Sequence, residues 1–255
     1  MSKDREPRGQ VQEFISRVPK RENRVSRRKP GRVLLGVVVP TIAAAAALSA
    51  CSGSPRSLPE IVTVPSTSQL PPASPRTAVD YNYANQAVGD ADLASVGDYS
   101  QVNQELKAIK NRTIAAFATA AADNAEAYSA LAAADNQQFT YSSPDDVTKA
   151  INSLRVRPIR RNARRALDWI FADQAEVAAD EALPDKKQAD ADVARISDPG
   201  IRDQAQRAVT LSLQMDYMNA DNLASLFSSR ASQIEETILV TGNIQGRILD
   251  KKAAA

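Results

Sequence analysis

The chain has no histidine and a single cysteine among its 255 residues, and aromatic residues make up only 5% of it. Histidine is the commonest general base and the commonest transition-metal ligand, so the usual means of both kinds of chemistry are absent. One cysteine excludes an internal disulfide and a multi-cysteine zinc site. The sequence also contains no glycine-rich phosphate loop and no nucleophile elbow. These absences predict a protein that is not an enzyme, with no catalytic residue, no metal and no cofactor.

Charge is unevenly distributed along the chain, although its net value is only +2. Residues 1–32 carry 11 basic and 4 acidic side chains, whereas residues 51–255 carry 21 basic and 26 acidic ones. The basic isoelectric point therefore comes from the N-terminal stretch. It does not indicate nucleic-acid binding by the remainder, and we expect no nucleic-acid partner.

Residues 33–50 read VLLGVVVPTIAAAAALSA and carry no charge. A basic stretch, an apolar run and terminal small residues are typical of a secretory signal, so residues 1–50 are expected to be a signal peptide. Its last residues, Leu48, Ser49 and Ala50, precede Cys51. This LSAC sequence resembles the lipobox of bacterial lipoproteins, in which an aliphatic residue and two small ones precede a cysteine. The resemblance implies cleavage before Cys51 and lipidation of its thiol, with fatty-acyl chains such as palmitate anchoring the protein.

An uncleaved membrane anchor is the alternative interpretation of this segment. Eighteen apolar residues just span a bilayer, and the basic flank would stay on the cytoplasmic side. Pro40 and the run of five alanines weigh against a spanning helix.

Proline dominates the stretch after the cysteine. Residues 52–77 contain six prolines and many serine and threonine residues, so neither a helix nor a central strand is expected there. We interpret residues 51–79 as the lipidated cysteine and a semi-rigid linker, at about 3 Å per residue where it is extended. A proline-rich ligand for a recognition domain is the alternative.

Residues 80–255 are predicted to be all-α. Apolar residues recur at helical spacing over residues 101–134, which predicts one helical stretch there. Ser143-Pro144 and Asp198-Pro199 are typical of helix starts, because the first residue caps the helix and proline suits its first position. A short helix is expected to about Leu154, and a second from about Pro158 to Pro184.

The last part of the chain is expected to contain a long amphipathic stretch through Phe227, a weak point at residues 228–232, and a final helix. Gly242 and Gly246 are expected to mark fraying or a break in it. No repeat at a fixed period is recognised. The whole predicts a helical bundle, coiled-coil-like, or an elongated helical hairpin with thin, alanine-rich seams.

Six arginines occur within residues 155–165, RVRPIRRNARR: Arg155, Arg157, Arg160, Arg161, Arg164 and Arg165. Positive charge near a helix start opposes the helix dipole, so helix stability does not explain the cluster. Three interpretations stay open: ion pairs with acids on a neighbouring helix, binding of anionic lipid or an anionic envelope polymer, and binding of an acidic partner protein.

Acidic residues follow the arginines, among them Asp168, Asp173, Glu176, Asp180 and Glu181. We interpret them as a solvated helix face. The alternatives are a carboxylate pair for glycoside hydrolysis and calcium binding, but no loop shows the ligand spacing of a dedicated calcium site.

Together these features predict an exported, membrane-anchored envelope lipoprotein with a non-catalytic helical scaffold that docks an envelope partner. The alternatives are an accessory component of a secretion or conjugation machine and a carrier of a hydrophobic small molecule or lipid. The anchor is expected in the outer membrane on its periplasmic side. In a Gram-positive cell it would be the outer leaflet of the cell membrane.

Overall fold

The computed structural model describes residues 69–94, 98–135, 143–181 and 184–255, which belong to one compact unit, Pro59–Ala255. Every regular element in these ranges is an α-helix, so the predicted all-α helical bundle is confirmed. The helices are α2 (Ala78–Leu93), α3 (Ser100–Ala108), α4 (Arg112–Asp135), α5 (Pro144–Ser153), α6 (Arg157–Asp180), α7 (Lys186–Arg195), α8 (Pro199–Leu213) and α9 (Tyr217–Ala253). The expected signal peptide and most of the linker lie outside the described residues.

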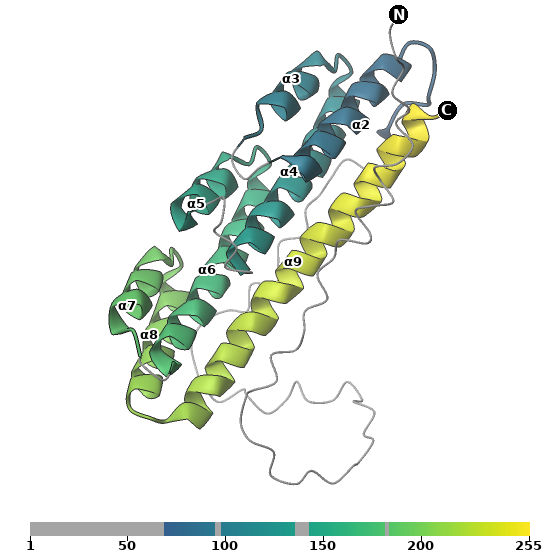
Figure 1. Ribbon diagram of the computed structural model, residues 1–255. Helices are drawn as coiled ribbons and strands as arrows, with labels where there is room; N and C mark the ends of the chain where they lie inside the picture. Colours follow the sequence, from purple (N-terminus) through teal and green to yellow (C-terminus); the bar gives the residue numbers. More distant parts are fainter. Residues whose placement is uncertain (1–68, 95–97, 136–142, 182–183) are drawn as a thin grey trace, which may run out of the picture. The chain divides into compact units, whose positions relative to one another are not determined.

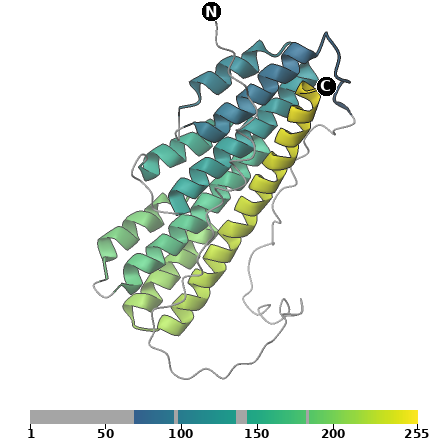
Figure 2. The ribbon, with the colours of Figure 1, turned by 45° about the vertical axis from the view of Figure 1, so that its right-hand side comes forward.

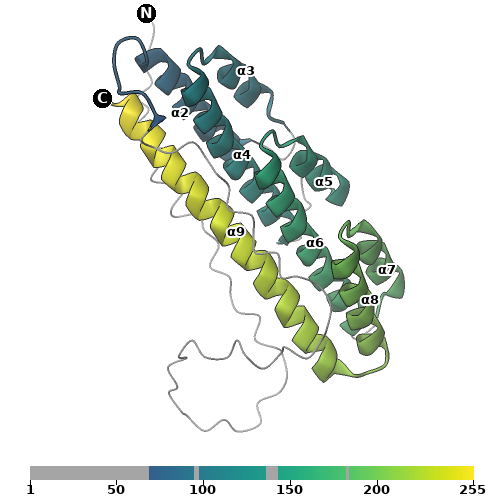
Figure 3. The same cartoon turned by 180° about the vertical axis from the view of Figure 1, so that it is seen from behind.

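The helices form three layers (Figure 1). The middle layer contains α2, α4, α6 and α8, and each of them contacts α9, which lies alone on one side. The short helices α3, α5 and α7 lie on the opposite side, as the view from behind also shows (Figure 3). With 37 residues, α9 extends for about 55 Å, and Figure 2 shows it running the whole length of the bundle.

The middle-layer helices run in one direction and are staggered. Asp123, within α4, accepts a hydrogen bond from Val156 at the start of α6, and Asp168, within α6, accepts one from Ser197 at the start of α8. Asp123 and Asp168 are each the twelfth residue of their helices, so each following helix starts about 17 Å further along. The long α9 runs antiparallel to these staggered helices and contacts all four of them.

An internal repeat underlies this arrangement, and its centre is an aspartate. Asp80, Asp123 and Asp168 are all buried, and each accepts backbone N–H bonds from the loop that leads into the next middle-layer helix. In the first unit the donors are Lys110 and Asn111, whose amides lie 3.0 Å from the two carboxylate oxygens of Asp80. Each carboxylate therefore satisfies amides that a helix start would otherwise leave without partners.

The apolar positions repeat around these aspartates. Alanines stand four, seven and eleven residues after each aspartate, and all nine are buried: Ala84, Ala87, Ala91, Ala127, Ala130, Ala134, Ala172, Ala175 and Ala179. Each loop begins with a buried aliphatic residue, and a buried isoleucine follows five residues later: Ile109 and Ile114, Leu154 and Ile159, Ile196 and Ile201. The aspartates are 43 and 45 residues apart, so this repeat has a variable spacing, which a search for a fixed period does not detect.

Three expected helix limits are wrong. The stretch 101–134 is divided at residues 109–111, because Asp80 binds two amides of that turn. The long stretch after Pro199 is divided at residues 214–216, whereas the expected weak point at 228–232 is helical. Helix α9 also continues through Gly242 and Gly246, because packing against the middle layer outweighs the low helix propensity of glycine.

Two expected helix starts are confirmed by their caps. The Ser143 hydroxyl accepts from the backbone amide of Asp146, and the Asp146 carboxylate accepts from the backbone amide of Ser143. Pro144 occupies the first position of α5. The Asp198 carboxylate accepts from Gly200 and Ile201 at the start of α8. These starts depend on neighbouring residues only, which is why sequence predicts them.

The seam between α4 and α9 is narrow at Gly242. A side-chain carbon added at Gly242 of α9 would lie 3.1 Å from Cβ of Asn124 on α4. One turn along, the Asn124 amide donates to Gln245 at 3.0 Å within the buried interface. Large side chains also pack between the helices, and Trp169 stacks on Phe227 with ring centroids 5.6 Å apart. Gly242 thus brings α9 close to α4, whereas most of the other buried positions of α9 carry large side chains, so the predicted thin, alanine-rich seams stay a prediction.

Candidate functional site

The first arginine of the 155–165 segment is held by acids of a neighbouring helix. Nη1 of Arg155 lies 2.5 Å from Asp123 and 3.0 Å from Glu126, both on α4 and both fully buried. Its other guanidinium nitrogens donate to the side-chain oxygen of Asn103 on α3. For Arg155 the structure therefore shows the ion-pair arrangement that was one of the three interpretations.

Two buried carboxylates share this one guanidinium. Burial raises the pKa of Glu126 to about 7, with Arg155 opposing the rise and the charge of Asp123 adding to it. Burial also raises the pKa of Asp123, against hydrogen bonds from Val156 and Arg155. A proton on Glu126 thus relieves the repulsion between two acids near neutral pH.

The other arginines divide into inward and outward groups. Arg160 donates to the carbonyl of Leu154, and Arg164 donates to Ser197 Oγ while its Nε lies 3.8 Å from Asp168. Arg157 and Arg161 are exposed, and Arg165 is half-buried. The six residues therefore do not form one surface. An anionic or acidic partner at the exposed arginines stays a prediction.

An acidic group that the sequence did not reveal lies where α6 meets α9. Carboxylate oxygens of Glu176, Asp180 and Asp221 lie within 4.8 Å of one another. Glu176 is buried and accepts from Ser212 Oγ of α8 at 3.0 Å. Oxygen ligands of this kind suit a hard cation such as Ca²⁺, although acidic groups are common without one. Asp221 comes from a different helix, so residue spacing could not have indicated the group.

The interpretation of the acids after Arg165 as a solvated helix face is wrong for two of them. Asp168 and Glu176 are buried, because one binds the loop before α8 and the other binds a hydroxyl of α8. Burial raises the pKa of Glu176 to about 7, the Ser212 hydrogen bond opposes this, and the charges of Asp180, Asp221 and Asp173 add to it. Two of the acids are thus structural parts of the bundle interior.

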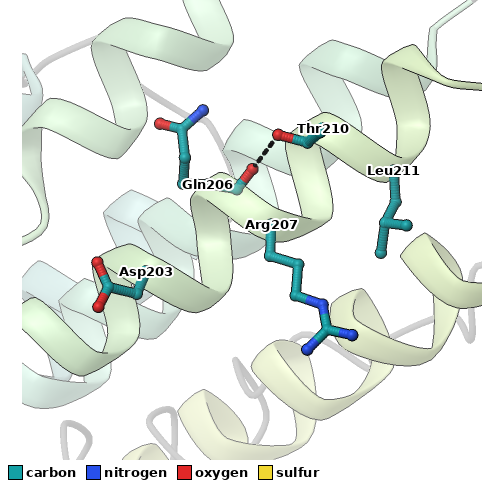
Figure 4. Close-up of a pocket in the computed structure, with 5 residues that line it drawn as sticks. All are labelled: Asp203, Gln206, Arg207, Thr210 and Leu211. Atoms are coloured by element: carbon teal, nitrogen blue, oxygen red, sulfur yellow. Dashed lines mark hydrogen bonds between the residues drawn. The ribbon is translucent and has the colours of Figure 1, made fainter.

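An open depression of about 430 Å³ runs along the outer side of α8. Its lining residues, Asp203, Gln206, Arg207, Thr210 and Leu211, recur at helical spacing on this one helix (Figure 4). Arg207 and Leu211 point towards one side and Asp203 and Gln206 towards the other, while Thr210 Oγ1 donates to the Gln206 carbonyl. The depression is open rather than an enclosed chamber, and charged, polar and apolar residues line it.

The predicted lipidation and cleavage residues, Cys51, Leu48, Ser49 and Ala50, lie outside the described residues, so their roles stay predictions. Among the helices that the structure does describe, none combines the length and apolarity needed to cross a membrane.

Comparison of the chain with models of known protein families, with curated proteins and with solved structures finds no match.

Proposed function

We propose that this protein is an exported lipoprotein, anchored through Cys51, whose helical repeat domain docks a partner in the cell envelope without catalysing a reaction. The LSAC sequence at the end of an uncharged stretch carries the anchoring half of the proposal. The row of repeated, staggered helical units supports the docking half. Arrays of stacked helical units present long surfaces that proteins commonly use for binding.

The junction between the proline-rich segment and the bundle fits a tether that ends on a firm support. Leu70 is buried in a cluster with Tyr81 of α2 and Leu249 of α9. The Tyr81 hydroxyl donates to the carbonyl of Pro71, and the Thr77 hydroxyl donates to that of Pro72. The tether is thereby held at one end of the bundle, where α2 begins and α9 ends.

The seams weigh against the carrier of a hydrophobic molecule. Such a carrier needs an apolar chamber between helices, whereas α9 meets the middle layer through buried side chains such as Phe227 and Ile234 and through Gly242 at short distance. A docking function uses the outer faces of the same helices and needs no such chamber.

Fatty-acid labelling of the full chain in bacterial cells tests the anchor. We expect wild-type protein to take up label and to stay in the membrane fraction, and a Cys51→Ala variant to take up none and to lose lipid-dependent retention. Ser52→Ala is the matched control and should behave like wild type. Equal labelling and retention of the Cys51→Ala variant would show that the anchoring half is wrong.

A further inference from the structure

Three large apolar side chains are exposed at the turn between α8 and α9. Leu213, Met215 and Met218 are 37%, 75% and 72% exposed. The chain contains three methionines, and the third is Met1, so both internal methionines lie at this tip. Methionine is flexible and polarizable, and it is frequent on surfaces that bind apolar faces of other proteins. We call Leu213, Met215 and Met218 the methionine tip.

The backbone at the tip holds a methionine where glycine is favoured. Met215 has φ of 64°, the one positive φ of a non-glycine residue within the described ranges. Its amide donates to Ser212 and the next amide, of Asp216, donates to Leu211, which is the bond pattern of a Schellman helix end. The left-handed position of that motif usually carries glycine, because a side chain there costs free energy. An exposed methionine kept at such a cost is a feature to explain by binding.

Acidic side chains lie beside the methionine tip. The carboxylates of Asp180 and Asp221 lie within 4.8 Å of that of Glu176, which accepts from Ser212 near the end of α8. Asp216 directly follows Met215 in the turn. An apolar surface beside negative charge complements a segment that carries both apolar and basic residues.

The methionine tip also lies far from the tether. The tether joins the bundle beside Leu249, near the end of α9, whereas the tip is at the start of the same helix, about 47 Å away (Figures 1 and 3). The depression along α8 ends at Leu211, whose carbonyl takes part in the Schellman turn, so it continues the tip along the helix.

We propose that the methionine tip and the adjoining depression bind a basic amphipathic helix of a partner protein. The apolar face of that helix covers Met215 and Met218, and its lysine or arginine side chains approach Asp180 at the end of α6 and Asp216 and Asp221 at the start of α9. This inference rests on the proposed docking function, because it names the surface and the chemistry of the partner.

The test uses the full chain in nanodiscs of neutral phosphatidylcholine, with empty nanodiscs as baseline. The probe is a synthetic amphipathic helix of leucine and lysine, and the same design with glutamate is its charge control. We expect the lysine peptide to bind wild type, and the Met215→Gly, Met218→Ser double variant to bind it at least about tenfold more weakly. Met215→Gly alone should keep or raise the thermal midpoint, because glycine suits the left-handed position, so lost binding would not reflect unfolding.

A Val240→Ser variant, at an exposed position of α9 far from the tip, is the matched control and should bind like wild type. Equal peptide binding by the double variant and wild type would overturn the proposal, as would equal binding of the glutamate peptide. Methionine-dependent binding to phosphatidylglycerol vesicles, or to a second copy of the chain, in place of the peptide would overturn it too. Because the double variant keeps Cys51, its membrane retention stays that of wild type, so failure of the anchor and failure of the tip are separable.

Discussion

Two loops of the bundle are each held by a buried aspartate, but the two aspartates have different further partners. The loop before α6 is held by Asp123 and the loop before α8 by Asp168, at equivalent positions of α4 and α6. At the first loop the carboxylate also binds Arg155, and Glu126 joins the pair. At the second it binds the hydroxyl of Ser197 at 2.7 Å, while Nε of Arg164 lies 3.8 Å away, beyond hydrogen-bond distance. The same geometry therefore tolerates a buried ionic network at one step and mainly neutral donors at the next.

The difference matters because removing one partner should cost a different amount of stability at each loop. Removing one partner from a buried ionic network leaves an uncompensated charge, which costs far more than the network contributes when intact. Removing one of several neutral donors leaves the carboxylate with its other hydrogen bonds. The step at Asp123 should thus be the more fragile of the two.

The largest effect is expected at the ionic step. An Arg155→Ala variant leaves Asp123 and Glu126 buried without their cation, and we expect a loss of about 3–5 kcal/mol in the free energy of unfolding at pH 8. Urea denaturation followed by circular dichroism measures it. Arg157→Ala, at the exposed neighbouring arginine, is the control and should change stability by no more than about 0.5 kcal/mol. A similar small change for both variants would contradict the fragility of this step.

A smaller effect, dependent on pH, is expected from Glu126. Its pKa is about 7 in the fold against an ordinary value of 4.5, so between these values the folded protein binds a proton that the unfolded chain releases. Its stabilising contribution is therefore present at low pH and is lost as the pH rises from about 4.5 to about 7. In Glu126→Gln we expect the fall in stability between pH 5 and pH 8 to shrink by about 1–3 kcal/mol.

Glu176→Gln on α6 is the counterpart for that experiment, because burial raises the pKa of Glu176 to about 7 as well, without an arginine partner in its hydrogen bonds. Unfolding curves at several pH values for both variants should show the same direction of change. A wild-type stability that rises steadily across this window, and a Gln variant with the same slope, would refute the assignment.

The smallest effect is expected at the neutral step. Ser197→Ala removes one hydroxyl donor from Asp168 and leaves the amides of Ser197 and Asp198, so we expect a loss of about 1–1.5 kcal/mol. Lys110→Ala, at the corresponding residue of the first unit, should leave stability within about 0.5 kcal/mol, because Asp80 binds its amide and not its side chain. A loss at Ser197 as large as that at Arg155 would remove the distinction between the steps.

Local signals explain what sequence predicted well. Ser143-Pro144 and Asp198-Pro199 start helices through contacts within three residues, and both caps are present in the structure. The division of the 101–134 stretch was missed because it depends on Asp80, some thirty residues away. Helix α7 was not predicted, since it is short and its first turn carries two lysines, which oppose the helix dipole.

The repeat and the acidic group escaped sequence reasoning for a related reason. The recurring residues are mostly alanines in an alanine-rich chain, and loop lengths change the spacing from one unit to the next. Asp168 and Glu176 looked like members of an exposed face, because their hydrogen-bond partners, Ser197 and Ser212, lie on distant parts of the chain. The methionine tip was missed because only the turn shows that Met215 and Met218 are exposed.

Sequence alone determined the fold class and two helix starts, because helix periodicity and capping are local properties of the chain. All the grounds for the proposed anchor at Cys51 also come from the sequence. Tertiary structure alone decided which acids are buried and which residues pair with Arg155. It also decided how α9 packs against the four middle-layer helices and which apolar residues remain exposed. These depend on the stagger of the long helices, which is set by contacts between residues far apart in sequence.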